Sequence, residues 1–231
     1  MTVRIKFRKF GVLKFIGHLD VMRYFQKAIR RAGIDVKYSM GFSPHQLMSF
    51  AAPLGVGLLS DGEYFDLEVN SLTSSEDMKK RLNECMVEGI EILSVKLLDE
   101  KAGNAMASVQ AASYTVRFYE EKLPVFSLED AVKRLMDKDK IPVVKTTKKS
   151  TVEMDLREGI YELSADDDKK EVTMLVNASS SGNIKPNFVI KELYHEMGEV
   201  LGDFDIIITR NETYTGTLNN FVPLDFEATL F

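Results

Sequence analysis

The order of the first structural elements follows from residues 3–33, which read VRIKFRKFGVLKFIGHLDVMRYFQKAIRRAG. Apolar and basic residues alternate over 3–8, and this period of two predicts a strand with one apolar face. From His18 to Ala32 the apolar residues recur at helical spacing, and Gly33 is a natural end for a helix. The segment therefore predicts a strand followed by an amphipathic helix.

The same strand and helix signals continue outward from this segment. Two strands are expected over 46–52 and 62–69, a helix from Ser74 or Ser75 to about Gly89, and a strand over 90–97. The second half repeats this order of elements. Its expected strands are 114–118, 141–145, 152–156, 161–164, 172–176 and 204–209, and its expected helices are 127–138 and 187–197.

The repeated order predicts the fold class. We expect an α+β chain of two tandem ferredoxin-like (βαββαβ) domains with antiparallel sheets. The predicted domains are 1–100 and 112–216, joined by a linker at 101–111 and followed by an apolar C-terminal tail at 217–231. One larger α+β domain is the alternative.

The composition excludes several classes of protein. Hydrophobic residues make up 45% and charged residues 28% of the chain, which excludes wholesale disorder. No apolar run is long enough for a membrane-spanning helix, and the charged N-terminus is unlike a secretory signal. Cys85 is the only cysteine, which excludes an internal disulfide, a four-cysteine zinc site and a self-contained iron–sulfur cluster. We expect a cytoplasmic protein with no metal or cofactor.

Positive charge is concentrated at the start of the chain. The first 50 residues carry a formal charge of +8, and the remaining 181 carry −13. Arg23, Lys27, Arg30 and Arg31 fall within about a third of the circumference of the first helix. Such a stripe is suited to RNA phosphates, although an acidic protein partner or a plain solvated face would also explain it.

Three further groups of residues are candidates for a site. Phe42 and His45 carry flat rings on a Gly-Phe-Ser-Pro-His loop and could stack on a base. Lys148, Lys149 and Arg157 form a second basic region, and in a duplicated chain the two loops could flank one groove. His18, Asp20 and His45 could form an acid–base or metal cluster, but their spacing does not match a metal-binding motif.

The sequence also resembles the bacterial radical-SAM-associated protein family. The matching phrases are His18-Leu19-Asp20, Arg30-Arg31-Ala32-Gly33, Gly41-Phe42-Ser43-Pro44-His45, Ser60 with Glu63-Tyr64, and Thr147-Lys148-Lys149 with Asp155-Leu156-Arg157. Ser43 replaces a common Asn, and Gln46-Leu47 stands where the family often has Pro-Arg, so this loop has one positive charge fewer.

The resemblance implies a context but no reaction. Members of that family occur as free proteins or fused to radical SAM proteins. The cluster of a radical SAM protein needs three cysteines, so the single cysteine of this chain implies an enzyme that acts in trans. We expect a noncatalytic accessory protein of a radical SAM protein. It would either bind tRNA or rRNA, or present a substrate to the radical SAM protein. The alternatives are an RNA-processing or RNA-modifying enzyme that uses His18, Asp20 and His45, and an adaptor that binds only protein.

Overall fold

The computed structural model describes residues 1–146, 151–202 and 204–231. These residues form two compact units, which are described separately here. Unit 1 consists of residues 1–110 together with 210–231, and unit 2 consists of residues 111–209. Both units are mixed α and β, and the chain is α+β, as expected, with a mostly antiparallel sheet and five α-helices among the described residues.

The sheet of unit 1 is built around β1 (Thr2–Lys9), which lies between β4 (Ile90–Leu97) and β3 (Leu59–Glu68). Both neighbours are antiparallel to β1, and Ile5 lies opposite Phe65 on one side and Val95 on the other. The short strand β2 (Met48–Phe50) pairs with β3, also antiparallel. The antiparallel pairing of β2 with β3 agrees with the antiparallel sheet that the sequence predicts.

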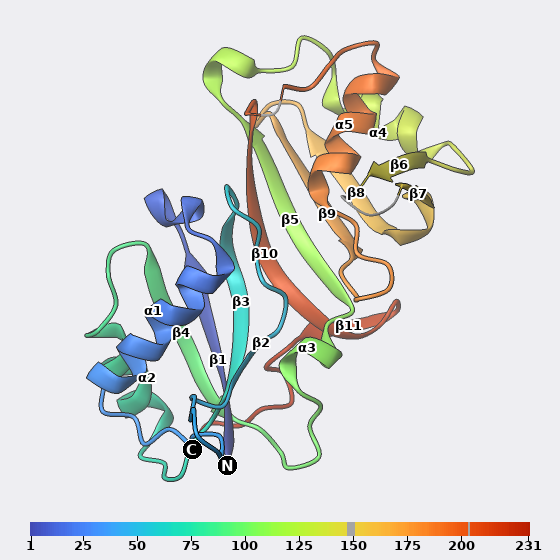
Figure 1. Cartoon of the computed structure of the whole chain (residues 1–231). Helices are drawn as coiled ribbons and strands as arrows, with labels where there is room; N and C mark the ends of the chain where they lie inside the picture. The colour runs from blue at the N-terminus through green and yellow to red at the C-terminus, as the bar shows by residue number, and fades with distance from the viewer. Residues whose placement is uncertain (147–150, 203) are drawn as a thin grey trace. The chain divides into compact units, whose positions relative to one another are not determined.

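Helices α1 (His18–Arg31) and α2 (Ser75–Asn83) cover one face of this sheet (Figure 1). Gly33, with a φ of +62°, ends the first helix as the sequence predicts. Ser74 caps the second, because its side-chain oxygen accepts a hydrogen bond from the Asp77 N–H at 3.1 Å.

The apolar core of unit 1 lies between this sheet face and the two helices. The rings of Phe7, Phe25, Phe50 and Phe65 pack against one another with centroids 4.8–6.2 Å apart. Alternation along β1 places Phe7 on this face and Arg4, Lys6 and Arg8 on the other face. The hydrophobic period of the first 33 residues therefore predicts the core face correctly.

The C-terminal part of the chain lies in unit 1. β10 (Ile206–Thr217) crosses into this unit at Arg210 and is followed by β11 (Asn220–Pro223), which pairs with it. Leu224 is buried, and Phe231 packs against the core of the unit. Residues 217–231, predicted as a tail after the second domain, thus belong to the same unit as the N-terminus.

Residues 101–110, most of the predicted linker, are also part of unit 1. They contain the short helix α3 (Ala105–Ser108), which Asn104 caps. Ala105 is fully buried, and its N–H donates to Asp66 Oδ2 at 2.7 Å. A small-residue sequence therefore folds against the polar face of the sheet, because its backbone supplies a donor to a buried carboxylate.

Unit 2 repeats the alternation of strands and helices with one insertion. β5 (Ala111–Phe118) pairs with β9 (Glu171–Asn177), and β9 pairs with β8 (Ile160–Asp166), both antiparallel. Helices α4 (Leu128–Met136) and α5 (Pro186–Glu196) complete it. The insertion is a separate hairpin of β6 (Pro142–Thr146) and β7 (Thr151–Asp155).

The described residues also include three short 3-10 helices in the connecting segments. They are η1 (Gly11–Phe15), η2 (Glu120–Lys122) and η3 (Arg157–Gly159). Within the part of the chain that the structure describes, no helix is long and apolar enough to cross a membrane.

Candidate functional site

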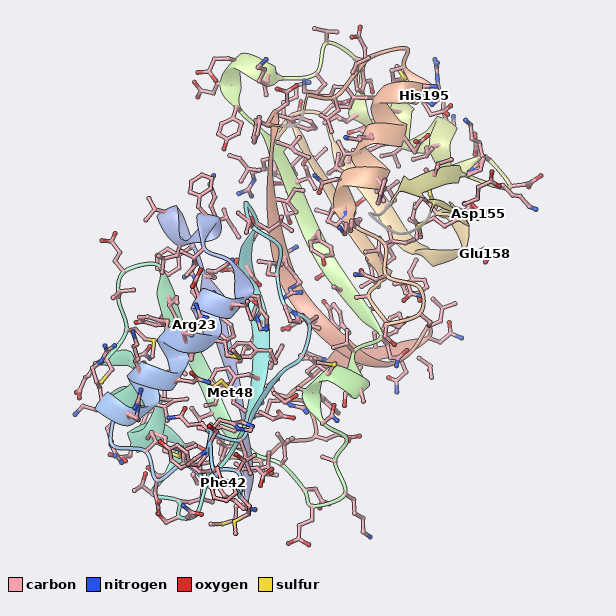
Figure 2. The ribbon with its side chains drawn as sticks, viewed as in Figure 1. Arg23, Phe42, Met48, Asp155, Glu158 and His195 are labelled. Atoms are coloured by element: carbon pink, nitrogen blue, oxygen red, sulfur yellow. The ribbon has the colours of Figure 1, made fainter. Side chains whose placement is uncertain are left out.

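The four basic side chains of α1 are exposed on the face opposite its buried residues, as the helical spacing predicts. Arg23, Lys27, Arg30 and Arg31 are all exposed, whereas Val21, Phe25, Ala28 and Ile29 are buried. Figure 2 labels Arg23 on this face. The four bases, called here the α1 basic face, therefore present their charge to solvent.

The partners of the α1 basic face leave most of its charge uncompensated. Arg23 lies 3.5 Å from Asp20, and both side chains are about two-thirds exposed, so this ion pair is weak. Arg30 donates to the Gln26 carbonyl at 3.4 Å, and Arg31 donates to the Cys85 carbonyl at 2.9 Å. These carbonyl partners orient the guanidinium groups but do not neutralise them.

The basic residues of β1 are, by contrast, paired with acidic residues from later in the chain. Arg4 binds both carboxylate oxygens of Asp66, at 2.8 and 2.9 Å, and Lys6 pairs with Glu212. Arg8 lies 3.1 Å from Asp61. The charge of +8 over the first 50 residues thus overstates the positive surface, because much of it is compensated within unit 1.

The loop 39–45 exposes an aromatic ring. Gly41 has a φ of +109°, and Phe42 is fully exposed. The Ser39 hydroxyl lies 2.9 Å from His45 Nδ1 and accepts from the His45 N–H at 3.1 Å. The base of the loop is therefore held together while the Phe42 ring remains in solvent (Figure 2).

Gln46 connects this loop to the basic helix. Its side chain is buried, and its Nε2 donates to the Gln26 carbonyl of α1 at 3.1 Å. On a helical projection Gln26 lies beside Arg23 and Arg30. The loop is thus fastened to the edge of the α1 basic face, within the same unit.

The three residues of the predicted acid–base cluster have separate surroundings. The His18 ring lies edge-on to Phe50, with centroids 5.1 Å apart, and partial burial lowers the pKa of His18. His45 bonds to Ser39, and Asp20 pairs with Arg23. Among the described residues His18 and His45 have different partners, and no group of three metal-binding side chains is found there.

The second basic region lies in unit 2. Lys148 and Lys149 fall outside the described residues. Arg157 begins η3, is partly buried, and its N–H donates to Asp155 Oδ1 at 2.9 Å. Figure 2 labels Asp155 and Glu158 at this position. Arg157 therefore belongs to a different unit from the α1 basic face.

A buried charged group in unit 1 was not predicted from the sequence. Arg210 lies 3.4 Å from Glu63, and both side chains are nearly inaccessible to solvent. Burial raises the pKa of Glu63 and lowers the pKa of buried Lys9, while attraction between the charges opposes both shifts. The sequence marks Glu63 as a polar residue of the hairpin and of the family motif, but nothing local in the sequence indicates that Arg210 will lie beside it.

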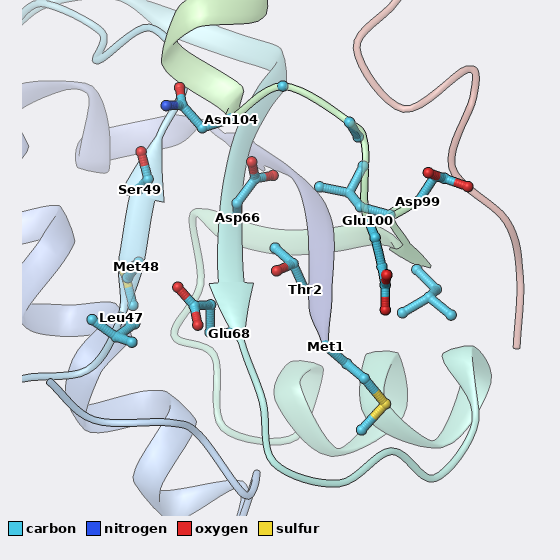
Figure 3. Close-up of a pocket in the computed structure, with 14 residues that line it drawn as sticks. Met1, Thr2, Leu47, Met48, Ser49, Asp66, Glu68, Asp99, Glu100 and Asn104 are labelled. Atoms are coloured by element: carbon cyan, nitrogen blue, oxygen red, sulfur yellow. The ribbon is translucent and has the colours of Figure 1, made fainter.

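A pocket in unit 1 has a volume of about 580 Å³ (Figure 3). Its lining combines apolar residues such as Met48 with four carboxylates, which are Asp66, Glu68, Asp99 and Glu100. Arg4 neutralises Asp66, and Lys37 pairs with Glu68 at 2.9 Å. The pocket therefore holds less free negative charge than its composition suggests.

Comparison with protein families places the chain in one of them. A family model described as "Uncharacterized protein conserved in bacteria (DUF2344)" matches residues 2–186. The chain therefore belongs to this bacterial family, and the match includes the α1 basic face, the 39–45 loop and Arg157. The search of curated proteins produced no match.

Proposed function

We propose that the chain is a noncatalytic accessory protein that binds RNA through the α1 basic face and the 39–45 loop. One observation carries the proposal: Arg23, Lys27, Arg30 and Arg31 are exposed together on α1, and no carboxylate from a distant part of the described chain pairs with them. A buried or compensated stripe would favour a structural role instead.

The geometry suits a flexible polyanion. Arg23 and Arg30 are seven residues apart, which is about 10 Å along the helix axis, so the face can engage more than one phosphate. The exposed Phe42 ring supplies a surface on which an unpaired base can stack. We therefore favour single-stranded or looped RNA, such as the loops of tRNA or rRNA, over a regular duplex.

The proposal includes a radical SAM enzyme as the partner and a tandem ferredoxin-like fold for the chain. The resemblance to radical-SAM-associated proteins, together with a single cysteine, supports a radical SAM enzyme that acts in trans in the cytoplasm. A tandem ferredoxin-like fold is supported in unit 1 by the central place of β1 between β4 and β3, and in unit 2 by the repeated alternation of strands and helices. An RNA-cleaving role for His18 and His45 gains no support from their separate surroundings.

The test is fluorescence anisotropy with labelled tRNA and rRNA fragments. We expect binding by the full chain to weaken about tenfold or more between roughly 50 and 200 mM salt. Lys27→Glu with Arg30→Glu should weaken binding by a similar factor at low salt.

The matched control is Lys133→Glu with Arg134→Glu. It makes the same change in charge at two exposed bases of α4 in unit 2. Equal losses from both double variants would show that only net charge matters and would contradict the assignment of the α1 basic face. Absence of binding at low salt would remove the RNA proposal.

A further inference from the structure

Four large apolar side chains are exposed on two segments of unit 2. Leu123 and Val125 follow η2 and are 45% and 89% exposed. Val200 and Phe204 follow α5 and are 89% and 88% exposed. These four residues are called here the apolar patch. Single exposed apolar residues are ordinary, whereas exposed apolar residues that lie together are typical of interaction surfaces.

The two segments form one surface because they are bonded to each other. The Tyr119 N–H donates to the Asp205 carbonyl at 3.3 Å, and Lys122 Nζ lies 3.5 Å from Asp205 Oδ1. Figure 1 shows both segments at the end of unit 2 where α5 finishes.

Tyr194 of α5 contacts both segments. The Phe126 ring packs edge-on against Tyr194 with centroids 4.9 Å apart, and the Glu199 N–H donates to the Tyr194 carbonyl at 2.9 Å. Tyr194 is itself buried. Both segments therefore contact the same buried residue, the first through its ring and the second through its backbone carbonyl.

Buried neighbours keep the patch exposed. Pro124, between Leu123 and Val125, is buried, and so is Leu201, next to Val200. Turning the exposed side chains inward would require these anchors to leave the core, which costs apolar burial. The exposure is thus built into the backbone of the two segments.

Negative charge surrounds the patch. Glu120, Glu121 and Glu199 are exposed, and none of them forms an ion pair with another described residue. Lys122, which is next to Glu121 in the chain, is paired with Asp205. Burial, then the charges of Asp205 and Glu199, raise the pKa of Tyr194 to about 12. A negative rim disfavours RNA and selects a positively charged partner.

We propose that the apolar patch is a docking surface for a partner protein that presents apolar side chains flanked by Lys and Arg. This interaction is separate from RNA binding, since it uses unit 2 and the opposite sign of charge. A protein with both surfaces can hold RNA with one unit and an enzyme with the other.

The chain contains no tryptophan, so a probe peptide with a single Trp reports binding by its own fluorescence. The probe is an amphipathic helical peptide of leucine and lysine, and its counterpart has glutamate in place of lysine. We expect the full chain to bind the Leu/Lys peptide at least tenfold more tightly than the Leu/Glu peptide. Val125→Ser with Phe204→Ser should weaken Leu/Lys binding at least tenfold.

The matched control is Val144→Ser with Leu218→Ser, at two exposed apolar residues outside the patch, and it should bind like the wild type. Glu120→Lys with Glu121→Lys should reduce the preference for the lysine peptide. Thermal unfolding of each variant confirms that these surface changes leave the fold intact.

Three results would overturn the proposal: no binding of the Leu/Lys peptide, equal binding of both peptides, or unchanged binding in the Val125→Ser and Phe204→Ser variant. A fourth result would also overturn it. If the wild type sediments as a dimer and the Val125→Ser and Phe204→Ser variant sediments as a monomer, the patch binds a second copy of the chain instead. RNA binding is measured on α1 variants, so either proposal can fail without the other.

Discussion

The strand β1 and the helix α1 each carry four basic residues, yet the structure uses the two sets in different ways. The bases of β1 are Arg4, Lys6, Arg8 and Lys9, and those of α1 are Arg23, Lys27, Arg30 and Arg31. Arg4 and Lys9 are almost completely buried, and Lys6 and Arg8 pair with acidic side chains. All four bases of α1 are exposed.

The difference follows from how each element is covered. β1 lies between β3 and β4, its apolar side faces the helices, and its other side is covered within unit 1. Arg4 there also donates to the carbonyls of Leu224 and Gly103. A buried charge needs a partner, whereas a charge on the outside of a helix needs none. The same residue type is therefore structural in β1 and available for binding in α1.

The largest effect is expected from removing a buried charge. Arg4→Ala leaves Asp66 buried without its bidentate partner and should lower the free energy of unfolding by about 3–5 kcal/mol. Arg23→Ala, the matched change in α1, should alter it by about 0.5 kcal/mol or less. Urea unfolding measures both, and similar losses at the two sites would contradict the comparison.

A smaller effect is expected from one hydroxyl on the polar face of the sheet. The buried Tyr64 hydroxyl donates to Glu212 Oε1 at 2.8 Å. Tyr64→Phe should cost about 1–3 kcal/mol, because the carboxylate loses a buried donor. Tyr38→Phe, at a partly exposed tyrosine, is the control and should leave the urea midpoint nearly unchanged.

The 39–45 loop should affect binding without affecting stability. Phe42→Ser removes a ring that is fully exposed, so the unfolding midpoint should not change. RNA affinity, measured by anisotropy, should fall by about 1–3 kcal/mol if one base stacks on the ring. Met40→Ser, at the exposed neighbour in the same loop, controls for general loss of apolar surface. Equal RNA binding by the Phe42 and Met40 variants would exclude stacking on Phe42.

The smallest expected effect is a dependence of the free energy of unfolding on pH, caused by His18 at the start of α1. Burial lowers the pKa of His18 below its usual 6.5, so the unfolded state binds more protons between the lowered value and 6.5. Stability contributed by His18 therefore rises with pH through that window and is lost as the pH falls.

His18→Phe keeps a ring against Phe50 and should remove this dependence. NMR titration of the histidines, with unfolding measured at several pH values between roughly 5 and 7, checks both points. A His18 resonance that titrates at or above 6.5 would contradict the assigned environment.

Some element ends depend on distant residues. The helix begun by Ser74 was predicted to continue to Gly89, but α2 ends at Asn83, whose side chain bonds to both the N–H and the carbonyl of Ile92. β10 continues to Thr217, well beyond the predicted Thr209, and Thr213 within it donates to the Gly62 carbonyl at 2.8 Å. Neither contact leaves a signal in the local sequence.

The candidate site likewise has features that could be predicted from the sequence and features that could not. The exposed stripe of α1 could be predicted, because a helix of fixed period with one apolar face must point its remaining side chains outward. The separation of His18 from His45, and the burial of Lys9 beside Glu63 and Arg210, could not be predicted. They depend on which strands become neighbours.

The sequence by itself determined the α+β class, most strands and helices, the core face of β1 and the basic face of α1, because hydrophobic period and helix caps act over a few residues. Only the tertiary structure decided which charges remain free. It brought Asp66 and Glu212 to β1 and returned the C-terminal residues to unit 1. Pairing between strands joins residues that are distant in the chain, so the partner of a charged residue depends on topology rather than on its neighbours in sequence.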